Sequence, residues 1–140
     1  MIDFLQEFHS GWRYVVIAFT VFVILFFIFA LLRKNTRAKL ETTLLKVWTG
    51  IVDLQILLGI LLLGSYLIDG VELGGEIIGH VVLMLLASTA AHGMAIYKRF
   101  NGEPNEQTRR ILGVVLPIVA MILIYLGVSA IGRGLFEKQL

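Results

Sequence analysis

The side chains of this sequence that can bind a metal or carry a proton are few, and most of them lie inside apolar stretches. There are three histidines, His9, His80 and His92, and no cysteine. Without cysteine the chain has no disulfides, thiolate metal sites, iron–sulfur clusters or covalent c-type haem attachment. It also has no Ser-His-acid or H-E-x-x-H pattern, so no hydrolytic apparatus is visible. Imidazole ligation and proton transfer are the chemistry that remains.

The composition indicates that these side chains belong to a membrane protein. The 140 residues are 58% apolar and only 16% charged, with a mean hydropathy of +0.88, whereas soluble domains carry about 25% charged residues. A chain of this size buries only about 60–70% of its unfolded surface, so it cannot hide that much apolar surface from water. Disorder requires the opposite composition. We therefore expect an integral membrane protein that has the lipid bilayer as a partner.

Four apolar stretches are long enough to cross a bilayer as helices, which takes about 20 residues. Lipid admits only helices or closed barrels, and four segments are too few strands for a barrel. Because the connections are short, neighbouring helices should be antiparallel. The predicted fold is all-α, an up-down-up-down four-helix bundle that forms one transmembrane domain over residues 1–140. Its spans are expected at about 11–32, 45–68, 75–97 and 111–131.

The charges predict the orientation of these spans. Of twelve basic residues, nine lie in or beside the two loops that follow the first and third spans: Arg33, Lys34, Arg37, Lys39, Lys46, Lys98, Arg99, Arg109 and Arg110. Basic loops stay in the cytoplasm, so both termini should face outward from the inner (cytoplasmic) membrane. Because topology accounts for the basic residues, no nucleic acid partner is expected.

Two histidines are predicted at a similar depth. His9 lies at the outer mouth of the first span, and His80 lies about one and a half turns into the third, which runs in the same direction. A haem held between two helices needs one neutral imidazole from each side at matching height. Arg13 follows His9 by four residues on the same helix face and can pair with a haem propionate. This arrangement predicts haem iron ligated by His9 and His80.

A simpler interpretation of each residue remains open. A histidine at a helix mouth is an ordinary interfacial residue, and Arg13 can extend to the lipid headgroups. His80 can be hydrogen-bonded to a backbone carbonyl or to Gln55, which lies inside the second span. Under this interpretation the polar groups specify helix packing and bind no cofactor.

Asp53 and His92 form a second predicted pair, on the cytoplasmic side. Asp53 enters the membrane with the second span and comes within a turn or two of the depth of His92. A buried hydrogen bond or ion pair between them is the economical explanation, because an ionisable residue inside the bilayer is costly alone. Its functional version is a proton-relay pair.

Three short motifs resemble a known family: His9-Ser10-Gly11-Trp12-Arg13, Leu54-Gln55-x-x-Leu58-Gly59 and His80-x-x-Leu83-x-x-x-Ala87. They are similar to one four-helix half of the haem A synthases, and to small bacterial cytochrome b-like membrane proteins with an H-S-G-W-R start. The resemblance covers about the first two-thirds of the chain. It implies His9 and His80 as axial ligands of one b-type haem, with Arg13 and Gln55 beside them. The synthase has eight spans, so haem A synthesis is not implied for these four.

Three functions follow from these observations. The first is a haem-b-binding membrane protein that transfers one electron near the outer leaflet, with quinol or another redox membrane protein as its partner. The alternative is a non-catalytic accessory or assembly subunit of a larger membrane complex. A third is a small proton-coupled transporter that works as a dimer, and so as a homo-oligomer, with Asp53 and His92 as coupling groups. An electron carrier or accessory subunit is favoured over a stand-alone enzyme.

Overall fold

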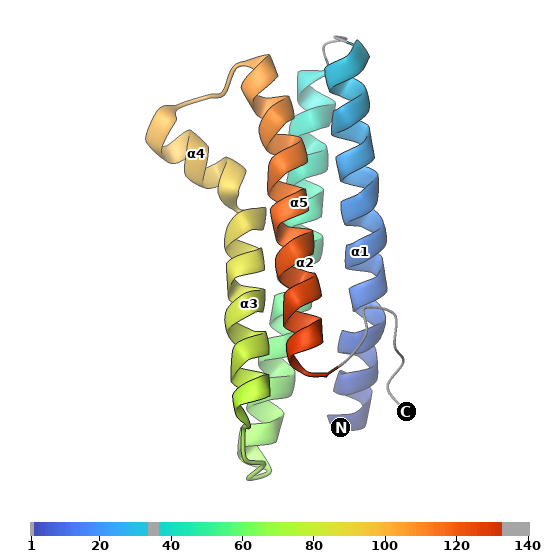
Figure 1. The fold of residues 1–140 in the computed structure, drawn as a ribbon, viewed down its shortest axis with the longest axis vertical. Helices are drawn as coiled ribbons and strands as arrows, with labels where there is room; N and C mark the ends of the chain where they lie inside the picture. Colours follow the sequence, from blue (N-terminus) through green and yellow to red (C-terminus); the bar gives the residue numbers. More distant parts are fainter. Residues whose placement is uncertain (1, 34–36, 133–140) are drawn as a thin grey trace.

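The regular secondary structure of the described part of the chain is entirely α-helical. The computed structural model describes residues 2–33 and 37–132, which contain five α-helices and no strand. The predicted all-α class is therefore confirmed for these residues, while Lys34 and the tail from residue 133 lie outside them. In chain order the helices are α1 (Ile2–Arg33), α2 (Ala38–Ile68), α3 (Gly75–Ala91), α4 (Gly93–Asn101) and α5 (Glu106–Ala130) (Figure 1).

Three of the helices, α1, α2 and α5, are each long and apolar enough to cross a membrane, and α3 with α4 makes a fourth if the two are one bent span. Large apolar side chains lie on their outer surfaces, where a soluble protein would place polar ones. On α1 these include Phe22, Leu25 and Phe29, each at least half exposed. The chain thus has the character of a multi-pass membrane protein.

The third apolar stretch is not the straight helix expected over residues 75–97. α3 ends at Ala91, α4 begins at Gly93, and the two axes differ by 51°. Gly93 permits this geometry, because a Cβ there would collide with the side chain of Leu116 on α5. The hydroxyl of Thr49 donates to the carbonyl of Ala91 at 2.9 Å, which satisfies one of the acceptors left open where a helix ends. In Figure 1, α4 leans away from the other helices.

The helices begin earlier than the apolar stretches do. The spans were expected from about residues 11, 45 and 111, whereas α1, α2 and α5 begin at Ile2, Ala38 and Glu106. The added turn of α5 is polar, whereas the added turns of α1 alternate polar residues with exposed aromatic ones such as Phe4 and Phe8. At the start of α5, Asn105 accepts a hydrogen bond from the backbone N–H of Thr108 at 2.8 Å, a standard N-cap.

Most of the packing between helices involves α5 or α1. α3 packs mainly on α5, and α1 packs on both α2 and α5, whereas α2 and α3 meet less extensively. Between α1 and α2 the fully buried indole of Trp48 donates to the hydroxyl of Thr20 at 3.0 Å, and Thr20 in turn donates to the carbonyl of Val16. Trp48 and Thr20 are thus hydrogen-bonded within this core, as an apolar surrounding requires.

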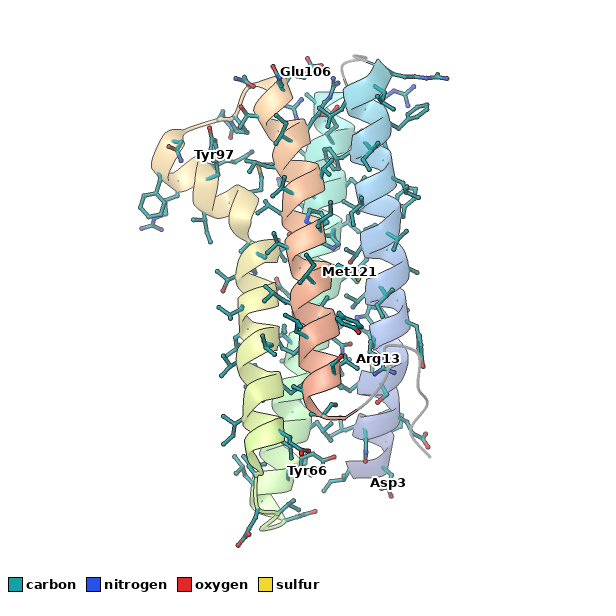
Figure 2. All side chains as sticks on the ribbon, in the orientation of Figure 1. Asp3, Arg13, Tyr66, Tyr97, Glu106 and Met121 are labelled. Atoms are coloured by element: carbon teal, nitrogen blue, oxygen red, sulfur yellow. The ribbon has the colours of Figure 1, made fainter. Side chains whose placement is uncertain are left out.

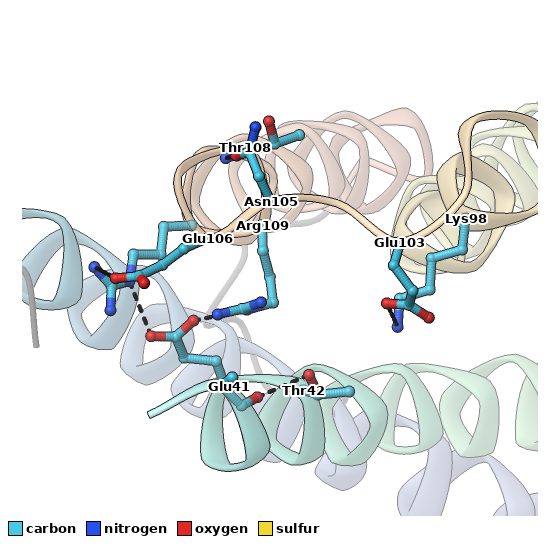
Figure 3. A network of polar contacts seen from close by, with 10 residues as sticks. Glu41, Thr42, Lys98, Glu103, Asn105, Glu106, Thr108 and Arg109 are labelled. Carbon is cyan, nitrogen blue, oxygen red and sulfur yellow. Dashed lines mark hydrogen bonds and ion pairs between the residues drawn. The ribbon is translucent and has the colours of Figure 1, made fainter. Parts of the chain in front are cut away.

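A buried carboxylate joins the start of α2 to the start of α5. Glu41 is fully buried and accepts from Arg109 Nε at 2.8 Å and from Arg110 Nε at 2.9 Å. Arg110 also contacts Glu106 one turn earlier. Figure 3 shows Glu41 between the two helices, with the pair of Lys98 and Glu103 lying further out. The chain connection from α4 enters α5 beside this cluster.

Replacing Glu41 with glutamine should destabilise the fold strongly. The Glu41→Gln variant leaves the poorly exposed guanidinium of Arg109 without its acidic partner and Arg110 with Glu106 alone, a loss of about 3–5 kcal/mol in the free energy of unfolding. Denaturant titration of the purified protein in detergent measures it. The matched variant Glu103→Gln removes a pair whose carboxylate is 80% exposed, so it should cost below about 1 kcal/mol. Equal losses in the two variants would contradict this account of Glu41.

Candidate functional site

The fold brings the first two histidines together. His9 on α1 and His80 on α3 have ring centroids 6.4 Å apart, and their ring planes are 79° from parallel. The sequence predicted them at matching depth, and the structure makes them neighbours across the space between α1 and α3. Two imidazoles on opposite sides of one metal, each about 2.0–2.1 Å from it by its nitrogen and with about 1.1 Å more to the ring centre, have centres about 6.3 Å apart. The observed separation fits that arrangement.

His80 is held in one orientation by α5. Its Nδ1 lies 2.7 Å from the carbonyl oxygen of Gly127, which can only accept, so Nδ1 carries the proton. In the neutral imidazole this leaves Nε2 as the unprotonated nitrogen, the one through which an imidazole binds a metal. Gly127 also permits the close approach, because a Cβ there would collide with Met84 on α3. The backbone carbonyl contact expected for His80 under the simpler interpretation is therefore present, and it also fixes the orientation of the ring.

Two residues of α2, Gln55 and Gly59, lie against His9. The side-chain amide nitrogen of Gln55 donates to the backbone carbonyl of His9 at 3.1 Å and lies 3.3 Å from each ring nitrogen. A Cβ at Gly59, one turn further along α2, would lie 3.1 Å from Cε1 of the ring. The Gln55 amide therefore lies close to both ring nitrogens of His9. A metal that binds a ring nitrogen from this side requires the amide to move aside. The amide oxygen Oε1 of Gln55 is buried and has no hydrogen-bond partner among the described residues.

A cavity of about 330 Å³ adjoins both rings, within the roughly 300–1,000 Å³ range of small-molecule sites. Arg13, which is 8% exposed, lies on its wall and contacts the ring and the hydroxyl of Tyr14. In Figure 2, Arg13 and Tyr66 lie toward the end of the molecule that holds Asp3. Most of the remaining wall is apolar and comes from α2, α3 and α5, including Ile60, Leu63, Val81 and Ile124.

Three participants in this site were not predicted from the sequence. Gly127 contributes a backbone carbonyl, which no side-chain pattern reveals. Glu76 lies one turn before His80 on α3, and Tyr66 lies near the end of α2; both line the cavity. The i, i+4 spacing of Glu76 and His80 is the one signal that could have placed Glu76 on the histidine face. The cavity wall therefore carries both a guanidinium and a carboxylate.

The structure also brings Asp53 and His92 together, at the junction of α3 and α4. Asp53 Oδ1 lies 3.0 Å from His92 Nε2, as an economical pairing of the two requires. Each side chain is nearly half exposed, so the pair is not buried as the sequence predicted. Both residues line a second cavity of about 280 Å³. His92 is twelve residues beyond His80, or about 18 Å along a helix. The two pairs are therefore separate sites.

Within residues 2–33 and 37–132, no three histidine or acidic side chains gather into a cluster that could hold a metal ion. A metal held by two imidazoles alone would need its other ligands from a bound group such as a porphyrin. Comparison of the chain with protein families, with curated proteins and with solved structures finds no match. The site must therefore be interpreted from its own geometry.

The proximity of His9 and His80 can be tested by crosslinking, because the sequence has no cysteine of its own. We expect the double variant His9→Cys/His80→Cys to be joined almost completely by a short bifunctional thiol reagent in native membranes. The joined product shows as a shift in mobility after cleavage between the two positions. In the control His9→Cys/His92→Cys, the second thiol is about 18 Å further along α3, and little product should form. Similar yields in both variants would contradict the described packing.

Proposed function

We propose that the chain is a membrane b-type cytochrome, a four-helix transmembrane bundle that holds one haem b between His9 and His80. In this bundle α3 and α4 form one bent span. The observation that carries the proposal is the pair of imidazoles, 6.4 Å apart at their centres and contributed by two helices. The hydrogen bond from His80 to Gly127 supports it, since a fixed tautomer is what ligand histidines usually have.

The other residues of the site have assigned roles in this proposal. Arg13, buried beside the cavity, is the partner for a haem propionate, since guanidinium groups pair well with carboxylates. The buried Oε1 of Gln55 can accept a hydrogen bond from the proton on Nδ1 of His9 once the amide has moved aside. Gly59 leaves room for the ring of His9 to adjust. The apolar remainder of the wall suits a porphyrin face.

Two neutral imidazole ligands leave haem iron no open position, so a haem held this way supplies one-electron transfer and not oxygen chemistry. The residues of the chain bind and orient the group and exclude water from it. We propose quinol or another redox membrane protein as the electron partner. The similarity of the H-S-G-W-R segment and of the His80 segment to one half of the haem A synthases supports the haem assignment.

The proposed location follows from the distribution of charge. The basic residues beside the α1–α2 and α4–α5 connections support a cytoplasmic location for that end of the bundle. Both termini then lie outside the inner membrane, and His9 and His80 lie in its outer half. Electrons would enter or leave the site from the outer leaflet.

The protein should be coloured when it is expressed with a supply of haem. We expect an oxidised Soret band and sharp reduced α and β bands from the purified wild type. His9→Ala and His80→Ala should each lose more than about nine-tenths of the reduced α band, because six-coordinate iron needs both ligands. His92→Ala is the matched control and should keep its spectrum. Circular dichroism and size-exclusion chromatography must show that all four proteins are folded.

Two results would overturn the proposal. One is a folded wild-type protein that stays colourless; if it also purified with larger membrane subunits, an accessory role would be favoured. The other is a spectrum that His92→Ala abolishes as completely as His80→Ala does.

A further inference from the structure

The second cavity lies beneath the bend between α3 and α4, and we refer to it as the bend cavity. It is about 280 Å³ and is separate from the haem site proposed above. Three cationic side chains reach it from three different helices: Lys46 from α2, Lys98 from α4 and Arg109 from α5. Asp53 and His92 lie on the same wall. Lys98 thus lines the same cavity as cations from α2 and α5, although α4 itself leans away from the other helices (Figure 1).

The bend cavity has more hydrogen-bond donors than acceptors. A guanidinium has five N–H donors, and Arg109 uses its Nε on Glu41 while its other nitrogens have no acceptor among the described residues. The carboxylate of Asp53 already faces His92. The hydroxyl of Thr49 donates to backbone carbonyls and so adds no free donor. Among the lining residues Asp53 is the one carboxylate, and it is already paired with His92, so three cations face a single negative charge.

The fixed acidic groups only partly balance the cations. Lys98 contacts Glu103 at 2.9 Å, but that carboxylate is 80% exposed, so the contact is easily exchanged. Glu41 neutralises part of the Arg109 and Arg110 charge. No ion pair with Lys46 exists within the described residues. A ligand that enters the bend cavity thus meets a net positive wall.

We propose that the bend cavity binds the phosphate of an anionic phospholipid. A phosphate diester brings acceptor oxygens and a negative charge to a wall on which three cations outnumber the one carboxylate. Apolar side chains line the same cavity, with Leu45 and Met94 the largest, and can contact the glycerol and the first acyl carbons. Beside it, Val47 on α2 and Ile96 on α4 are exposed apolar residues, as expected where acyl chains lie against the protein.

The inference goes beyond the proposed haem function and does not depend on it. The basic residues alone needed nothing beyond topology to explain them. The structure adds their convergence on one cavity, which a topological signal does not require. Free phosphate shares the same chemistry, so the experiment must separate the two sources.

Lipid binding can be measured on the full chain in a neutral detergent from its thermal unfolding midpoint. The additives are dioleoyl phosphatidylglycerol, dioleoyl phosphatidylcholine and inorganic phosphate, each titrated separately. We expect only phosphatidylglycerol to raise the midpoint. Lys46→Gln should weaken its apparent affinity about fivefold, and Lys46→Gln/Lys98→Gln more than tenfold. The matched double variant Lys39→Gln/Arg99→Gln removes the same charge from residues that do not line the cavity, and its affinity should change less than twofold.

The alternative outcomes each contradict the proposal. Equal stabilisation by phosphatidylcholine would show that the negative headgroup is not recognised. Stabilisation by inorganic phosphate at similar concentration would make a soluble anion the ligand. Equal weakening in the control double variant would reduce the effect to diffuse surface charge. Both double variants must first unfold at the same temperature as the wild type without lipid, which separates lost binding from lost folding.

Discussion

The close packing of α1, α3 and α4 against α5 determines where the cavities of this molecule lie. Helices pack tightly where one of them lacks a side chain, and glycines make three such contacts with α5. Gly113 lies against the ring of Phe27 on α1, Gly127 against Met84 on α3, and Gly93 against α5 from the start of α4. A Cβ at any of the three would collide with its neighbour. α1 and α3 are thereby both drawn onto α5.

Because α1 and α3 pack on α5, the contact between α2 and α3 is less extensive. Both cavities adjoin this contact between α2 and α3. The polar side chains that a membrane would otherwise exclude lie along these two cavities. Toward one end, His9, His80 and Gln55 surround a mostly apolar space suited to a flat cofactor. Toward the other, Asp53 and His92 lie beneath a bend rimmed by cations. One packing constraint thus separates the proposed haem site from the proposed lipid site.

The sequence predicted the parts of this arrangement that depend on helix direction and depth. Antiparallel spans were enough to bring His9 near His80, and to bring Asp53 near His92. The break after Ala91 was not predicted, because a single glycine such as Gly93 is tolerated inside a helix, and its contact with Leu116 on α5 is visible only in the structure. The carbonyl that orients His80 belongs to the backbone, and the partners of Glu41 lie almost seventy residues away. Contacts of that kind leave no periodic signal in a sequence.

The central claim is that two imidazoles from α1 and α3 ligate the same iron, and electron paramagnetic resonance of the oxidised protein tests it most directly. Ring planes 79° apart predict a low-spin ferric signal of the strongly anisotropic type that near-perpendicular axial imidazoles produce. The signal should stay unchanged when exogenous imidazole is added, since no coordination position is open. A high-spin signal in the haem-loaded protein, converted to low-spin by added imidazole, would contradict the claim.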